Sequence, residues 1–65
     1  MNIYEIVNSL EEYYDYNEPS FDQMCSFCEE EGITIDDKIE EIIECILDNG
    51  KLVWGLVDCR NYVPA

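Results

Sequence analysis

Isoleucine recurs at helical spacing between residues 35 and 46, and acidic residues fill most of the positions between the isoleucines. Because an α-helix completes a turn every 3.6 residues, the isoleucines gather on one side of such a helix and the acids on the other. This pattern predicts an amphipathic helix that buries one side against other elements. The predicted apolar side consists of Ile35, Ile39, Ile42, Ile43 and Ile46.

Two further helical segments precede this one. Apolar residues spaced i, i+3, i+4 and i+7 predict a helix over about residues 2–14. Ser20 and Gln23 fit a capping box, which predicts that a second helix begins at Phe21. Gly32 suits the end of this second helix, because glycine readily adopts the left-handed conformation there.

A β-hairpin is predicted after the third helix, which we expect to end at Asn49 and Gly50. Residues 51–58 are rich in strand formers, and residues 62–65 can return as a short second strand. The sequence therefore predicts an α+β fold in which three helices are followed by a C-terminal β-hairpin. We expect residues 1–65 to form a single domain, because a chain of this length builds one small core.

The charge balance narrows the classes of function. Sixteen acidic residues, three basic residues and no histidine give a net charge of −13. Such a chain repels nucleic acid and anionic membranes and attracts basic surfaces. The absence of histidine and of a glycine-rich phosphate loop argues against an enzyme, and we expect no cofactor. The first residues do not resemble a signal peptide and no apolar run reaches about 20 residues, so a cytoplasmic location is expected.

The acids form two candidate binding clusters for a basic partner. Asp37, Glu41, Glu44 and Asp48 step by four, three and four residues along the third predicted helix, which aligns them opposite the isoleucines. Three consecutive glutamates occupy the end of the second helix, where the helix dipole disfavours negative charge. A solvated surface would explain either cluster, but like charges at this spacing destabilise a helix. The predicted partner-binding residues are Glu29, Glu30, Glu31, Asp37, Glu40, Glu41, Glu44 and Asp48.

Four cysteines allow two interpretations. Cys25 and Cys28 are spaced as in a zinc half-site, and Cys45 and Cys59 bring the count to the four ligands that structural zinc prefers. However, the first two fall inside a predicted helix and near its apolar side, as does Cys45. Unpaired cysteine is one of the most frequently buried residues, so core thiols are the favoured interpretation and zinc is the alternative.

Tyrosines are concentrated in the acidic stretch "EEYYDYNEP". At helical spacing Tyr13 or Tyr14 is expected to close the core beside Leu10, and exposed tyrosine near acids is a frequent composition of protein interfaces. Trp54 lies in the predicted strand and is expected in the core or at its edge.

The predicted order of elements resembles the winged helix-turn-helix family. The segment "EEGIT" is similar to the turn of the helix-turn-helix pair, and "ILDNGKLVWGLVDCRNYVPA" is similar to a recognition helix that runs into a wing. DNA-reading members carry basic or amide side chains on the outer face of the recognition helix. Acids occupy those positions here, so the resemblance implies a fold and a protein-binding role and not DNA binding.

These observations favour a non-enzymatic acidic module that binds the basic surface of a nucleic-acid-binding protein by mimicking nucleic acid. In size and charge the chain is similar to small acidic phage or mobile-element proteins that inhibit host-defence enzymes, such as anti-CRISPR and anti-restriction proteins. For a phage protein the expected location is the host cytoplasm. Two alternatives are a winged-helix adaptor that docks through the apolar "LVWGLV" wing in a transcription or replication complex, and a four-cysteine zinc module. The sequence leaves the oligomeric state open.

Overall fold

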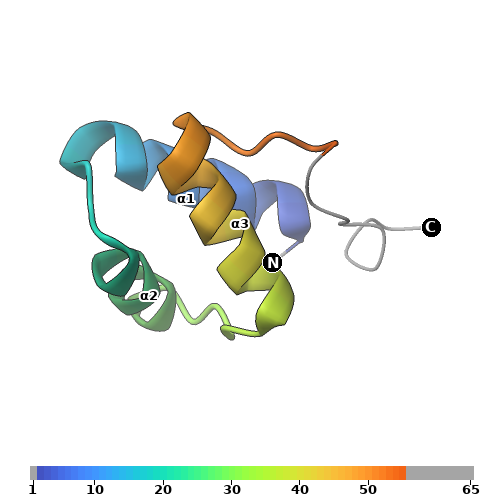
Figure 1. The fold of residues 1–65 in the computed structure, drawn as a ribbon. Coiled ribbons are helices and arrows are strands. Elements are labelled where there is room, and N and C mark those ends of the chain that lie inside the picture. Colours follow the sequence, from blue (N-terminus) through green and yellow to red (C-terminus); the bar gives the residue numbers. More distant parts are fainter. Residues whose placement is uncertain (1, 56–65) are drawn as a thin grey trace.

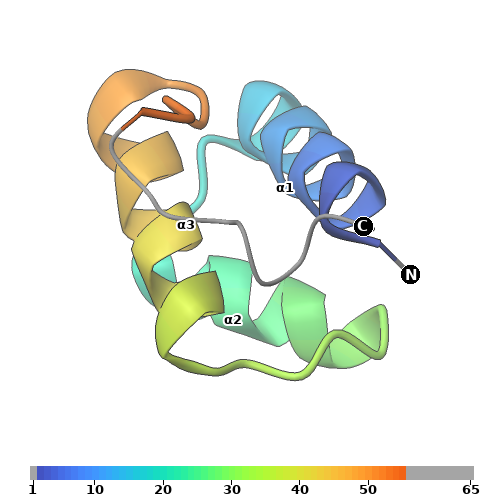
Figure 2. The same cartoon turned by 90° about the vertical axis from the view of Figure 1, so that its right-hand side faces the viewer.

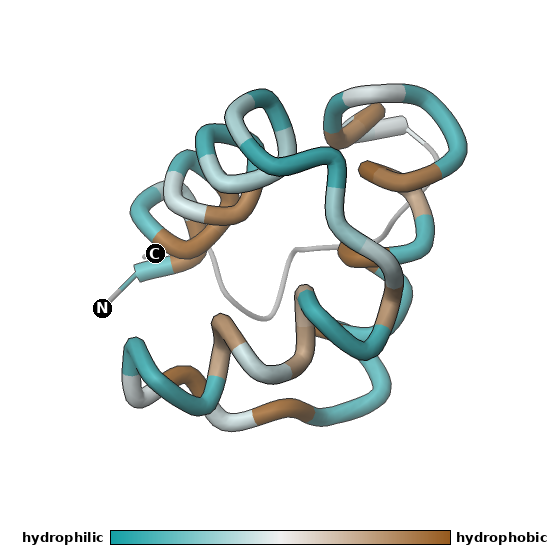
Figure 3. Tube along the Cα trace, turned by 90° about the vertical axis from the view of Figure 1, so that its left-hand side faces the viewer, coloured by the Kyte–Doolittle hydropathy of each residue, from teal (hydrophilic) through white to brown (hydrophobic). Residues whose placement is uncertain are grey.

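Three helices make up the fold. The computed structural model describes residues 2–55, which form α1 (Ile3–Asn17), α2 (Phe21–Glu30) and α3 (Asp37–Asn49) (Figure 1). Each helix contacts the other two, and together they surround a common interior (Figure 2). The hydrophobic positions of each helix face that interior, whereas the hydrophilic positions face outward (Figure 3). The prediction of three helices in this order is confirmed.

α1 extends farther than its apolar spacing predicts. It begins after Asn2, whose side chain accepts a hydrogen bond from the Glu5 N–H at 3.0 Å. Its end lies three residues beyond Tyr14, where Glu18 adopts a left-handed conformation with φ of 43° and donates its N–H to the Tyr14 carbonyl at 2.8 Å. Pro19 follows and cannot continue the helix.

α2 has the predicted local signals at both ends. The side chain of Ser20 accepts from the Gln23 N–H at 3.3 Å, and the Gln23 side chain accepts from the Ser20 N–H at 2.8 Å. After the helix Gly32 is left-handed, with φ of 75°, and the next residue, Ile33, donates its N–H to the Cys28 carbonyl at 2.8 Å. Burial of both Ile33 and Cys28 completes the hydrophobic contact that accompanies this Schellman-type ending.

α3 is capped at both ends by local interactions. The side chain of Asp36 accepts a hydrogen bond from the Ile39 N–H at 2.9 Å. At the other end Gly50 is left-handed, with φ of 79°, and donates its N–H to the Ile46 carbonyl at 2.7 Å. The predicted end of this helix is therefore confirmed.

The core lies where the three apolar helix sides meet. No polar or charged residue among residues 2–55 is buried. Ile35, at the start of the predicted isoleucine stripe, is half-buried, whereas the rest of the stripe is fully enclosed. The buried hydrophobic residues that form this core are Ile3, Ile6, Val7, Leu10, Met24, Cys28, Ile33, Ile39, Ile42, Ile43, Cys45, Ile46 and Leu52.

The prediction of an α+β fold with a C-terminal hairpin is wrong. Within residues 2–55 the chain is all-helical and forms no β-strand. Residues 51–55, which should begin the first strand, follow α3 as irregular chain and a turn. The second predicted strand, at 62–65, lies outside the described residues. Residues 51–55, the described part of the first strand expected from the winged-helix resemblance, therefore form no wing.

Side chains of α1 and α3 accept hydrogen bonds from backbone N–H groups of the segment that was predicted to form the first strand. Leu52 is buried, and its N–H donates to the Glu11 carboxylate at 2.9 Å. The Val53 N–H donates to the Cys45 sulfur at 3.3 Å. β-Propensity expresses how well a side chain fits a pleated, half-buried surface, and it is easily overridden by other contacts. Here α1 and α3 supply those contacts and hold the segment against the helices.

Candidate functional site

The outer side of α3 carries the main acidic surface. The isoleucines of α3 are buried against α1 and α2, so the opposite positions face solvent. At about 100° per residue the acids there lie within roughly 100° of the helix circumference. We call this set the α3 acidic face. All its members are exposed, as predicted: Asp37, Glu40, Glu41, Glu44 and Asp48.

Among residues 2–55, the one ion pair on this face is made by Lys38. The Lys38 Nζ lies 3.2 Å from a carboxylate oxygen of Glu41, one turn along α3. The Glu41 side chain is 56% exposed, so solvent screens the pair and its contribution to stability is small. No ion pair is formed by Glu40 or Glu44 within residues 2–55. These two carboxylates, at i and i+4, therefore repel each other without a neighbouring positive charge among the described residues.

One member of the α3 acidic face acts electrostatically on α2. Burial is the main cause of the raised pKa of the Cys25 thiol, and the negative charges of Asp22 and Glu40 add to it. Glu40 is therefore close enough to α2 for its charge to be felt there. Sequence spacing alone does not show this proximity.

The three glutamates of the second predicted cluster do not all have the same neighbours. Glu29, Glu30 and Glu31 are all exposed at the end of α2. However, Glu31 lies beside residues of α1, where it lines a pocket. The structure thus associates Glu31 with α1 rather than with the α3 acidic face.

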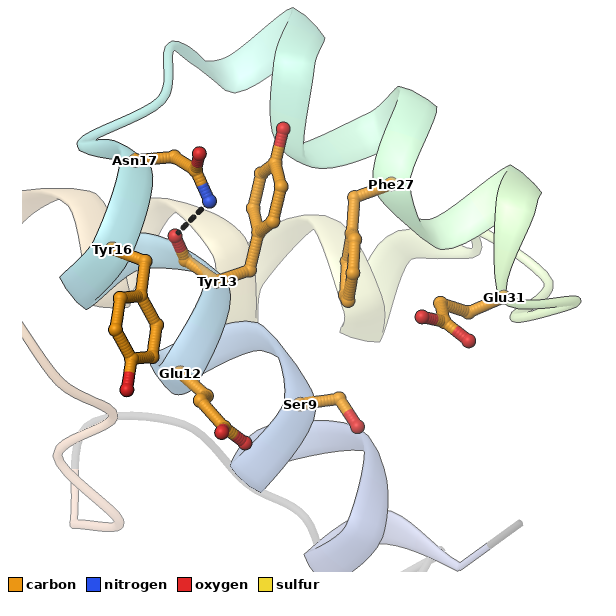
Figure 4. A pocket seen from close by; sticks show the side chains of 7 residues that line it. All are labelled: Ser9, Glu12, Tyr13, Tyr16, Asn17, Phe27 and Glu31. Carbon is orange, nitrogen blue, oxygen red and sulfur yellow. Dashed lines mark hydrogen bonds between the residues drawn. The ribbon is translucent and has the colours of Figure 1, made fainter.

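A pocket of about 420 Å³ lies between α1 and α2 (Figure 4). Tyr13 from α1 and Phe27 from α2 stack at its centre, with ring centroids 4.3 Å apart and planes inclined by 16°. Tyr13 and Tyr14 both pack partly buried against the core, which confirms that a tyrosine closes it here. The pocket residues are Ser9, Glu12, Tyr13, Tyr16, Asn17, Phe27 and Glu31.

This pocket was not predicted, although part of its lining has a sequence signal. Ser9, Glu12, Tyr13 and Tyr16 follow i, i+3, i+4 and i+7 spacing, and therefore share one side of α1. Phe27 pairs with this side across the helix interface, a contact that spacing within one helix does not reveal.

The described cysteines behave as core thiols. Cys28 and Cys45 are buried and Cys25 is half-buried, whereas Cys59 lies outside the described residues. Burial raises the pKa of the Cys28 thiol to about 11 and also raises the pKa of the Cys25 thiol. Within residues 2–55 no three histidine, cysteine or acidic side chains are grouped to hold a metal ion. The zinc alternative thus gains no support from the described cysteines.

Trp54 lies at the surface and not in the core. Its side chain is 45% exposed and contacts Tyr4 of α1, with ring centroids 5.4 Å apart. Of the two positions expected for Trp54, the core and its edge, the core position is wrong; the buried residue of this segment is Leu52, two residues earlier. The adaptor alternative needed Trp54 in an apolar wing, and that wing is not formed in residues 51–55.

No family model, curated protein or solved structure matches this chain. Among the described helices none is both long and apolar enough to cross a membrane. Two surface features of the described residues could bind a partner, the α3 acidic face and the pocket between α1 and α2.

Proposed function

We propose that this protein is a non-enzymatic inhibitor that binds the nucleic-acid-binding surface of another protein. The α3 acidic face takes the place of a phosphate backbone in that complex. The observation that carries the proposal is the set of five exposed carboxylates on one side of one helix, with a single lysine paired among them. The residues of this face would contact basic side chains of the partner, together with Glu29 and Glu30 at the end of α2.

The spacing of the face suits a phosphate strand. The eleven-residue step from Asp37 to Asp48 rises about 16 Å along α3, so the four aligned acids are roughly 5 Å apart along the axis. One DNA strand carries a charge about every 3.4 Å of axis. A basic groove that accepts phosphates at that interval can meet carboxylates at this similar interval.

The cost of the face to its own helix supports a functional role. Glu40 and Glu44, like Glu44 and Asp48, are like charges four residues apart, which destabilises a helix by about 0.2–0.5 kcal/mol per pair. Lysine at one of these positions would remove the repulsion without loss of helix propensity. A small domain that retains several unfavourable pairs on one exposed side is best explained by a partner that neutralises them.

The class of partner follows from charge and size. A net charge of −13 steers the protein toward strongly basic surfaces and speeds the encounter with them. Nucleases of host defence, of the RNA-guided and restriction types, hold nucleic acid in such surfaces. We therefore place the partner among these enzymes, as for the small acidic inhibitors that this chain resembles in size and charge.

A competition experiment tests the proposal. Several RNA-guided and restriction nucleases, each bound to fluorescent duplex DNA, would be titrated with the protein while fluorescence anisotropy reports release of the DNA. We expect release from at least one nuclease, with an apparent affinity that decreases steeply as salt is added, because salt screens the attraction. Stable complexes that contain nuclease, DNA and this protein together would contradict the mimicry.

Paired variants locate the interface. Changing Glu40 and Glu44 together to Gln relieves their repulsion, so the fold should be unharmed while inhibition decreases by about tenfold or more. The control is the double change Glu5→Gln and Asp15→Asn, which removes the same charge from exposed positions of α1. Equal losses for both pairs would show that net charge, and not the α3 acidic face, drives binding.

A further inference from the structure

We propose that the pocket between α1 and α2 is a binding site for an arginine side chain of a protein partner. The proposal deepens the function proposed above, because it names one side chain of the basic partner. It does not depend on nucleic-acid mimicry, since the pocket lies between other helices than the α3 acidic face and has its own chemistry.

The aromatic pair provides an apolar surface for the stem of the arginine. Tyr13 and Phe27 are both half-buried, so each keeps part of its ring open to the pocket. Their centroids are 4.3 Å apart, which leaves no room for a group between the rings. A guest must therefore lie against the parts of these rings that are open to the pocket, which Tyr16 of α1 also lines. A planar guanidinium stacks well on aromatic surfaces, and the methylene groups of arginine cover apolar carbon.

Acceptors of two helices surround this apolar surface. Glu12 comes from α1 and Glu31 is the C-cap of α2, and both carboxylates are exposed. Asn17 donates its side-chain N–H to the Tyr13 carbonyl at 3.1 Å, so its side-chain oxygen remains an acceptor. The pocket lining includes no lysine or arginine. Two carboxylates beside aromatic rings match a guanidinium, which has five donors in a planar arrangement and pairs bidentately with carboxylates.

Other guests fit this chemistry less well. An anion is repelled by Glu12 and Glu31. A neutral apolar guest would cover two carboxylates without giving them hydrogen-bond donors, which is costly. The lysine ammonium is compact and strongly hydrated, so it gains less from flat aromatic surface than a guanidinium does. A volume of about 420 Å³ lies toward the small end of ligand pockets, in keeping with one inserted side chain.

Nuclear magnetic resonance on the full chain tests the site with a defined probe, N-acetyl-arginine methylamide, at constant ionic strength. We expect saturable shift changes at Ser9, Tyr13 and Phe27. The citrulline analogue has nearly the same shape without the charge, and should bind at least about tenfold more weakly. The lysine analogue should also bind more weakly than arginine. Equal binding of arginine and citrulline, or shift changes confined to α3, would overturn the proposal.

Matched variants separate the pocket from the general negative field. Changing Glu12 and Glu31 together to Gln should weaken arginine binding by about fivefold or more. Changing Glu5 to Gln and Asp22 to Asn removes the same charge from the same two helices outside the pocket, and should weaken it less than about twofold. All four side chains are exposed, and circular dichroism checks that the fold is retained. Equal effects of the two pairs would overturn the site. That result would leave the nuclease competition untouched, because the competition is tested through Glu40 and Glu44.

Discussion

At the scale of single residues, Cys28 shows how a titratable group is fitted into the core. Its thiol is fully buried, and burial, followed by the neighbouring Cys25 and Glu29, raises its pKa from 9.0 to about 11. The thiolate is the reactive form of cysteine, so at neutral pH this side chain is inert and packs as a small apolar group. The pKa of Cys25 is raised as well, chiefly by burial, and so a reactive pair at the CxxC spacing is not favoured.

This shift predicts a loss of stability at alkaline pH. Between about pH 9 and 11 the unfolded chain loses the Cys28 proton while the folded chain retains it, so the free energy of unfolding decreases as pH rises through this window. The decrease can reach a few kcal/mol, since each pKa unit corresponds to about 1.36 kcal/mol. Urea unfolding at several pH values would compare the natural protein with Cys28→Ala. Tyrosine and lysine titrate in both proteins, so identical pH dependence in the two would contradict the prediction.

At the scale of the elements, the two ends of α2 differ. Its N-terminal end is stabilised by capping and charge, whereas its C-terminal end is destabilised by negative charge. A capping box satisfies its first N–H groups, and Asp22 in the first turn complements the positive end of the helix dipole. Its last turn contains Glu29 and Glu30, with Glu31 as the cap, and no basic residue. This end therefore repels its own helix dipole, and it remains available to a basic partner.

The same Glu→Lys change at a C-terminal and at an N-terminal helix end measures this repulsion. Glu30→Lys at the end of α2 should raise the free energy of unfolding by about 0.3–1 kcal/mol, because a positive charge complements the negative end of the dipole. Glu5→Lys, in the first turn of α1, makes the same change in net charge but opposes the dipole there. It should therefore stabilise less than Glu30→Lys, or destabilise. Thermal unfolding compares the two variants, and equal midpoints would show that net charge outweighs the dipole.

Sequence and structure agree where the signals are local. The capping box at Ser20 and Gln23 and the glycines at 32 and 50 specify helix ends through neighbouring atoms, so these boundaries could be predicted. The hairpin could not be rejected, because the hydrogen bond that replaces it joins Leu52 to Glu11, 41 residues away.

The same division applies to the candidate site. Helical periodicity places the α3 acidic face correctly on the outside, because exposure follows from the burial of the isoleucines on the other side. The pocket depends on how α1 and α2 are rotated toward each other, which brings Tyr13 to Phe27. No spacing within either helix contains that information.

At the scale of the whole molecule, negative charge works against compactness. The chain has sixteen acids and three bases, and fourteen of the fifteen acids within residues 2–55 are exposed. Mutual repulsion among them is relieved when the chain expands, so it destabilises the folded state. A basic partner would remove this repulsion as it binds, which couples binding to stability.

Added salt should therefore stabilise the isolated protein. The Debye length decreases from about 30 Å at 0.01 M to about 8 Å at 0.15 M, which screens repulsion across a domain of this size. We expect the midpoint of thermal unfolding to rise between these concentrations, as followed by circular dichroism. An equal concentration of a neutral solute serves as the control. A midpoint that stays constant or falls would mean that the exposed acids do not repel one another appreciably.

The hydrogen bond from Leu52 to Glu11 also bears on the order in which the chain folds. Each helix is closed by local contacts, whereas this bond joins α1 to the segment after α3 across 41 residues. Closing so long a loop has an entropic cost that one hydrogen bond does not offset, so the bond adds little until the core has formed. The segment after α3 should accordingly dock late in folding and detach early in unfolding. The contact of Glu11 would then affect the unfolding rate of the assembled helices more than their folding rate.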